Sequence, residues 1–191
     1  MEEKERGVKT FVVLGMHRSG TSLLAKALHT FNNDPKVSMG ATMLEDALEN
    51  AEELGLANAS NPQGHFEDDE FMQLNERILA AAGGSWFKPP TREELVSVSA
   101  QFSDDIKALV KKRSSAIWGW KDPRSCLTLD LFHPHLDNPH YICMFRDPED
   151  VADSLVRRDK DTIGMYKEYG VNLAKEYNRR ILQFISEVGV I

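Results

Sequence analysis

A glycine-containing loop between an apolar run and a helical run is the feature that most constrains this chain. The run TFVVL at 10–14 is β-branched, aromatic and apolar throughout, which is typical of a strand covered on both faces. GMHRSGTSLL follows at 15–24, and apolar residues then recur with helical spacing until Asn32-Asn33-Asp34-Pro35. This order predicts a phosphate-binding turn, in which backbone N–H groups and a helix N-terminus face an anion.

The loop lacks one residue on which nucleoside triphosphatases depend. Those enzymes place a lysine directly after the second glycine, where it reaches the β- and γ-phosphates. This chain has Thr21 at that position and Arg18 in the middle of the loop. Asp122 closes a later strand, but Lys121 beside it disfavours a magnesium site. We therefore expect the loop to hold one terminal phosphate with a reactive group attached, which Arg18 is placed to meet.

Two further buried strands are predicted at 116–120 and 141–145, and polar residues follow each of them. Lys121-Asp122-Pro123-Arg124 comes after the first strand, and Arg146-Asp147-Pro148 comes after the second. Ligands of open α/β sheets bind in the crevice at the carboxyl ends of the strands. We therefore expect these two clusters and the glycine loop to converge on one site.

The remaining pattern predicts helices at 21–31, 41–54, 68–82, 103–112 and 165–187, with another from Pro148 onward. Asp147 suits the N-cap of that helix and Pro148 its first position. Strands that alternate with helices predict an α/β fold of three layers, with a central, mostly parallel sheet flanked by helices as in P-loop nucleoside triphosphatases. The 191 residues fit one domain over 1–191.

Composition excludes several classes of function. The chain has 23 basic and 30 acidic residues, and a net charge of -7 argues against broad binding of nucleic acid or anionic membranes. Cys126 and Cys143 lie in apolar contexts without a pairing pattern, which favours a reduced compartment. The sequence shows no signal-peptide core and no apolar stretch near the roughly 18 residues of a spanning helix. We expect a cytoplasmic protein without a membrane span.

Four stretches taken together resemble the sulfotransferase family, particularly its bacterial branch. They are GMHRSGTSLL, NPQGHFEDDEF, WGWKDPR and FRDPEDVADSLVRRD, which occur in the family's order between residues 10 and 160. The resemblance implies transfer of a sulfuryl group from 3′-phosphoadenosine-5′-phosphosulfate (PAPS) to an acceptor oxygen or nitrogen, with PAP as the product. Magnesium is not expected, because a sulfuryl group carries less negative charge than a phosphoryl group. Thr21 can then replace the lysine, because PAPS has no γ-phosphate.

The resemblance also implies a set of site residues. Arg18 to Ser22 correspond to the cradle for the 5′-phosphosulfate, and Arg146 and Ser154, eight residues apart, correspond to the pair that binds the 3′-phosphate. The predicted catalytic residues are Arg18 at the transferring group, Lys121 at the leaving oxygen and, by a loose match, Glu67 as general base. The predicted donor-binding residues are His17, Arg18, Ser19, Gly20, Thr21, Ser22, Arg146 and Ser154, and no metal ligand is predicted.

Several of these residues have simpler interpretations that the sequence leaves open. Arg146 can pair with a neighbouring acid such as Asp147 or Asp150. Glu67 opens an acidic run at a helix start, where acids favour the helix dipole. Lys121 and Arg124 can be surface charges after a strand. Arg157, Arg158 and Lys160 can help to neutralise the 3′-phosphate, although a solvated helix end is favoured for them.

Two other functions and the identity of the acceptor also stay open. A nucleotide kinase or triphosphatase predicts magnesium-dependent binding of ATP, and a non-catalytic module predicts binding of PAP without turnover. A small molecule, sugar, lipid or peptide can be the acceptor, and the oligomeric state is not specified. Relatives usually continue past the final helix into a segment that helps to cover the nucleotide. A chain ending at Ile191 is therefore expected to be a compact member, a fragment or a member that has lost part of the site.

Overall fold

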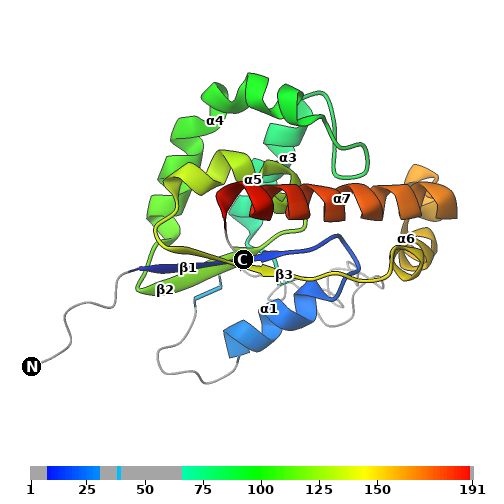
Figure 1. Cartoon of the computed structure of the whole chain (residues 1–191), viewed down its shortest axis with the longest axis horizontal. Coiled ribbons are helices and arrows are strands. Elements are labelled where there is room, and N and C mark those ends of the chain that lie inside the picture. Colours follow the sequence, from blue (N-terminus) through cyan, green and yellow to red (C-terminus); the bar gives the residue numbers. More distant parts are fainter. Residues whose placement is uncertain (1–7, 31–37, 40–65, 190–191) are drawn as a thin grey trace, which may run out of the picture.

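The computed structural model describes residues 8–30, 38–39 and 66–189 (Figure 1). Strands β1 (Lys9–Leu14), β2 (Ile117–Lys121) and β3 (Pro139–Cys143) form a parallel sheet in the order β2-β1-β3. The three predicted strands are therefore confirmed, with boundaries that differ by one or two residues. β1 lies in the middle of the sheet, with β2 on one side and β3 on the other. The loop after β1 therefore lies at the position where the strand order changes direction, which is where α/β sheets bind ligands.

Helices surround the sheet in the described part of the chain. They are α1 (Thr21–Thr30), α3 (Asp69–Ala81), α4 (Arg92–Arg113), α5 (Ser125–Phe132), α6 (Pro148–Ile163) and α7 (Lys167–Val188), with a 3₁₀ turn at His133–His135. Asp147 caps α6 and Pro148 is its first residue, as predicted. α4 begins earlier than the predicted helix at 103–112, because Thr91 and Glu94 form a capping box. The predicted helix at 41–54 lies outside the described residues.

The helices form two layers with the sheet between them. Figure 1 shows α1 on one face, α3, α4, α5 and α7 on the other, and α6 beyond the carboxyl ends of the strands. The larger core joins the sheet to the second group of helices and includes Trp120, Phe71 and Tyr177, all fully buried. The smaller core packs Ala25 of α1 against Val13 of β1. This confirms the predicted three-layer α/β fold with a parallel sheet.

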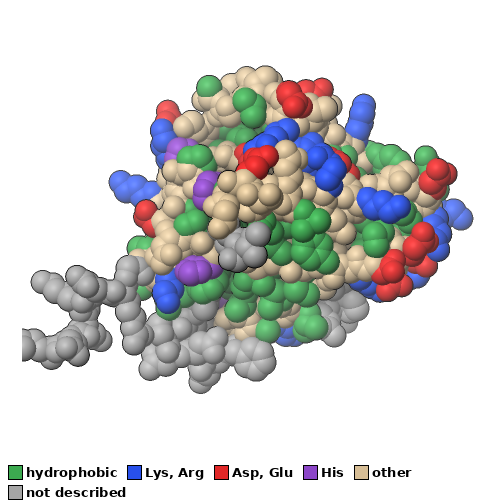
Figure 2. Space-filling model, viewed as in Figure 1, with side chains coloured by type: hydrophobic (Ala, Val, Ile, Leu, Met, Phe, Trp, Pro, Cys, Tyr) green, Lys and Arg blue, Asp and Glu red, His purple; other side chains and the backbone are tan. Residues whose placement is uncertain are grey.

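Charges on the helical surface are mixed. Figure 2 shows acidic and basic side chains interspersed over α4, α6 and α7 on the face in view. Arg92, for example, contacts both Asp130 and Glu187, and burial is modest in each pair. None of the described helices has both the length and the apolar composition needed to cross a membrane. The positive charge that matters for an anionic ligand must therefore be sought locally, at the edge of the sheet.

Candidate active site

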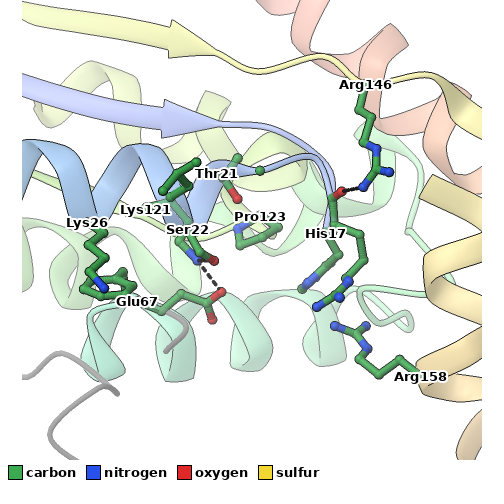
Figure 3. A pocket seen from close by; sticks show the side chains of 13 residues that line it. His17, Thr21, Ser22, Lys26, Glu67, Lys121, Pro123, Arg146 and Arg158 are labelled. Atoms are coloured by element: carbon green, nitrogen blue, oxygen red, sulfur yellow. Dashed lines mark hydrogen bonds and ion pairs between the residues drawn. The ribbon is translucent and has the colours of Figure 1, made fainter. Parts of the chain in front are cut away.

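An open cavity of about 220 Å³ lies beyond the carboxyl ends of β1 and β2, where the polar clusters were expected to converge (Figure 3). The loop after β1, the start of α1, the residues before α3, the turn after β2 and α6 all contribute to its wall. Its lining residues are His17, Arg18, Gly20, Thr21, Ser22, Leu23, Lys26, Phe66, Glu67, Lys121, Pro123, Arg146 and Arg158. Of the predicted site residues, only Ser19 and Ser154 are not among them, and Ser154 contacts Arg18 directly.

The glycine loop has the tight geometry that its sequence predicts. A Cβ at Gly15 would lie 2.6 Å from Cγ2 of Thr21 and 2.8 Å from the carbonyl oxygen of Met144, so only glycine fits there. Gly20 has φ +90°, and Arg18 also adopts a left-handed φ of 70°. The turn leads into α1 at Thr21, where the Gly20 carbonyl oxygen accepts hydrogen bonds from the N–H groups of Leu23 and Leu24, and the N–H groups of Thr21 and Ser22 precede these bonds. These groups form the anion-facing part of the cavity.

A buried thiol accepts a hydrogen bond from the glycine loop. The Gly15 N–H donates to Sγ of Cys126 at 3.2 Å, and Cys126 lies at the start of α5. Burial raises the pKa of the Cys126 thiol, so the sulfur stays protonated and acts as a structural contact rather than a nucleophile. Cys126 and Cys143 are both free cysteines, in agreement with the absence of a pairing pattern in the sequence.

Arg18, Arg146 and Ser154 meet at one end of the cavity. Nε of Arg18 donates to Oγ of Ser154 at 2.8 Å, and Nη1 of Arg146 donates to the Arg18 carbonyl oxygen at 3.1 Å. Arg146 also pairs with Asp150, but at 3.5 Å and with both side chains largely exposed, so this ion pair is weak. The three residues that the resemblance links to the two phosphates of the donor are therefore neighbours in space.

Arg158 adds a third cation to this end, which corrects the favoured interpretation of a solvated helix end. Its guanidinium carbon lies 5.2 Å from the centre of the Trp86 ring, its Nη2 lies 2.8 Å from Asp159, and its side chain is 18% exposed. Trp86 in turn contacts His17, with ring centres 4.6 Å apart. Arg158 follows Ser154 by one helical turn, so both face the cavity from α6.

Burial and the positive charges of neighbouring arginines lower the pKa of Arg18. Burial lowers the pKa of this guanidinium, and the positive charges of Arg158, Arg157 and Arg146 lower it further, while Asp159 acts in the opposite direction. Cations held close to one another in this way favour the binding of a multiply charged anion, which offsets their mutual repulsion. This arginine end of the cavity consists of Arg18, Arg146 and Arg158.

The middle of the cavity is built around a buried ion pair. Nζ of Lys121 lies 2.7 Å from Oε1 of Glu67 and 3.3 Å from Oγ of Ser22, and the two charged side chains are 1% and 7% exposed (Figure 3). Lys121 is therefore not a surface charge. Glu67 directly precedes Asp68, the N-cap of α3, and its buried ion pair with Lys121 gives it a contact besides the helix dipole. Sequence reasoning left both points open, since strand ends and helix starts often carry solvated charges.

A polar network fixes the turn behind Lys121. Asp122 accepts bonds from the backbone N–H of Arg124 at 3.0 Å, from its Nη1 at 2.9 Å and from Nδ2 of Asn75 at 2.8 Å. Burial raises the pKa of Asp122, and the Arg124 guanidinium opposes that rise. Arg124 also lies 3.5 Å from Glu67, so the network joins the ion pair of the cavity to the core. Arg124 is thus buried, which excludes the surface interpretation.

The structure offers no metal centre within the residues it describes. No group of three or more His, Cys, Asp or Glu side chains in 8–30, 38–39 and 66–189 is arranged to hold an ion. His133 and His135 lie in the 3₁₀ turn after α5, and Nδ1 of His133 forms a hydrogen bond with the hydroxyl of Tyr141. The candidate site therefore consists of cations, hydroxyls, backbone N–H groups and one carboxylate.

Comparison with known proteins agrees with the motifs. A model of the sulfotransferase family matches residues 10–188, which is nearly the whole chain. A search of curated proteins finds no significant match. The family match covers the described segments that line the cavity, which are the loop after β1, α1, the residues before α3, the turn after β2, Arg146 and α6. The chain therefore belongs to the sulfotransferase family.

Proposed function

We propose that this protein transfers a sulfuryl group from PAPS to a hydroxyl or amine of its acceptor. The observation that carries the proposal is the buried Lys121 ammonium, which shares one cavity with the glycine loop and the arginine end. Among the described residues, five cationic side chains and one carboxylate line this cavity. A ligand with two separate phosphate groups suits such a lining, and PAPS carries one at its 3′ position and one in its phosphosulfate.

Each end of the donor has a matching set of groups. The N–H groups at the start of α1, with the hydroxyls of Thr21 and Ser22, would hold the 5′-phosphosulfate. Arg146, Ser154 and Arg158 would hold the 3′-phosphate by charge-assisted hydrogen bonds. Arg18 lies between the two sets, with its backbone in the loop and its guanidinium on Ser154. The donor set therefore fits PAPS.

The proposed roles of Lys121 and Glu67, in the middle of the cavity, follow from the atoms on which charge develops during sulfuryl transfer. PAPS supplies a sulfuryl group on a phosphate leaving group. Negative charge then grows on the bridging oxygen of the departing nucleotide, and the fixed Lys121 ammonium stabilises that charge in the transition state. Glu67 would accept the proton of the attacking hydroxyl. We propose that Arg18 stabilises the transferring group as well, which requires its guanidinium to move from Ser154 toward that group.

A ligand titration tests the donor. We expect PAP to raise the midpoint of thermal unfolding, because a ligand at 100 times its dissociation constant adds about 2.7 kcal/mol to the free energy of unfolding. Arg146→Ala should remove at least about half of this shift, because a tenfold rise in the dissociation constant lowers the added free energy to about 1.4 kcal/mol at the same PAP concentration. ATP with magnesium serves as the control nucleotide, and stabilisation by ATP with magnesium but not by PAP would contradict the proposal. Turnover is then measured with sulfur-labelled PAPS and a panel of phenols, sugars and peptides, with Lys121→Ala as the inactive control.

A further inference from the structure

One cation of the cavity has no role in the donor site described above. Lys26 lines the cavity from α1, and Figure 3 shows it on the opposite side of Ser22 and Glu67 from Arg146 and Arg158. Its Nζ lies 5.6 Å from the centre of the Phe66 ring, within the range of a cation–π contact. Within the described ranges, no ion pair or side-chain hydrogen bond of Lys26 is present besides this contact, so its ammonium can pair with an anionic group of a ligand in the cavity.

Two apolar residues line the cavity next to Lys26. One is Leu23, which precedes Lys26 by about one helical turn and is 68% exposed, and the other is Phe66. Phe66 has φ 52°, a left-handed conformation that a bulky residue rarely adopts and that places its ring beneath the ammonium group. This end of the cavity thus pairs one available positive charge with an apolar wall.

The chemistry of in-line transfer assigns this end to the acceptor. The attacking atom approaches opposite the leaving oxygen, so the acceptor and the donor nucleotide lie on opposite sides of the transferring group. With the 3′-phosphate at the arginine end and the 5′-phosphosulfate at the start of α1, the acceptor must lie beyond the transferring group on the side of Lys26, and its hydroxyl must face Glu67. This step rests on the proposed function, because it uses the position of the donor.

We propose that Lys26, Leu23 and Phe66 form an acceptor subsite for hydroxyl compounds that carry an apolar body and an acidic group. The acidic group pairs with the Lys26 ammonium, the apolar body lies against Leu23 and Phe66, and the hydroxyl faces Glu67. A neutral acceptor of the same shape gains only the apolar contacts. The protein should therefore prefer an acid to the ester of that acid.

Binding of matched acids and esters tests the subsite. Hydroxyaryl carboxylic acids of increasing chain length and their methyl esters are titrated calorimetrically into the full chain saturated with PAP. We expect at least one acid to bind about tenfold more tightly than its ester at low salt, since a hydrogen bond to a charged group contributes about 1.5 kcal/mol. Lys26→Gln should reduce this ratio to about one, Lys26→Arg should keep it, and Leu23→Ser should weaken acid and ester alike.

Two results would overturn the subsite. One is a ratio near one for every pair in the unmodified protein. The other is a loss of PAP affinity in Lys26→Gln, which would assign Lys26 to the donor. Failure of the proposed function gives a different result, because PAP would then not stabilise the unmodified protein. In that case the same acids and esters, titrated without PAP, still show whether Lys26 binds an acidic group.

Discussion

The middle of the cavity and its arginine end hold their cations in opposite ways. In the middle, Lys121 is buried against Glu67, and Arg124 is buried against Asp122. At the arginine end, Arg146 is exposed with one weak ion pair, and burial and neighbouring cations lower the pKa of Arg18. The first region has its charges balanced before a ligand binds. The second holds three arginines near Asp150 and Asp159, and its cations also act on one another.

This difference predicts which properties can be separated by mutation. Breaking a buried ion pair leaves an uncompensated charge in the core, so fold and chemistry should fail together in the middle of the cavity. An exposed arginine contributes little to folding, so at the arginine end ligand affinity should fall while stability is kept. The predictions below test this contrast, beginning with the largest effect.

Lys121→Ala should have the largest effect of any single change in the cavity. It leaves Glu67 buried with a more distant partner, Arg124 at 3.5 Å, and we expect a loss of about 3 kcal/mol in the free energy of unfolding. Sulfuryl transfer should fall below detection, because the group that stabilises the leaving oxygen is absent. Urea unfolding and turnover of labelled PAPS measure the two losses.

The double variant Lys121→Met with Glu67→Gln separates these losses. Replacing a buried ion pair by neutral groups of similar size is often close to neutral for stability, so this variant should unfold within about 1 kcal/mol of the unmodified protein and still be inactive. A double variant as unstable as Lys121→Ala would show that the pair is not what balances the charges. Recovery of activity in it would remove Lys121 and Glu67 from the mechanism.

Arg146→Ala should separate affinity from stability. Its removal deletes one bond to the Arg18 carbonyl and a weak ion pair, so the free energy of unfolding should change by no more than about 0.5 kcal/mol. The dissociation constant of PAP should rise about tenfold or more, because hydrogen bonds to a charged group contribute about 1.5–3 kcal/mol. Calorimetric titration of PAP at low salt measures this change.

Arg77→Ala provides the matched control. Arg77 lies on α3 in an exposed ion pair with Asp105, and it does not line the cavity. Its removal should leave PAP affinity unchanged. Equal losses of affinity in the two variants would indicate a diffuse field of the whole protein instead of a localised arginine end.

The sequence predicted the parts of this contrast that depend on local pattern. The glycine loop, the three strands and the turn at Asp147 carry signals within a few residues, and the parallel sheet then brings the strand ends together. Burial of Lys121 and Arg124 could not be predicted in this way. It depends on Glu67 and Asn75, which lie about fifty residues earlier in the chain and reach the turn only through the packing of α3.

Two further features were missed for related reasons. α5 was not predicted because seven of its eight residues are buried, so Ser125–Phe132 shows no polar face to reveal a helical period. Arg158 was taken for a solvated residue because its partner, Trp86, lies in a loop before α4 and far away in sequence. The one local signal that Arg158 belongs to the site was its spacing of four residues from Ser154. This spacing shows only that Ser154 and Arg158 share a face of a helix.

Trp86→Leu should have the smallest effect and should sharpen the description of the arginine end. Leucine keeps much of the apolar volume and the backbone carbonyl that Tyr177 bonds, but it removes the ring beneath Arg158 and beside His17. We expect PAP affinity to fall about two- to fivefold, as the loss of an exposed cation–π contact of about 0.5–1 kcal/mol predicts. Trp86→Phe should keep most of the affinity, because it retains an aromatic face. A loss as large as that of Arg146→Ala would mean that the indole contacts the nucleotide itself. In that case the Trp86 ring would form part of the nucleotide-binding surface, and the ion pair with Asp159 would be the contact that positions Arg158.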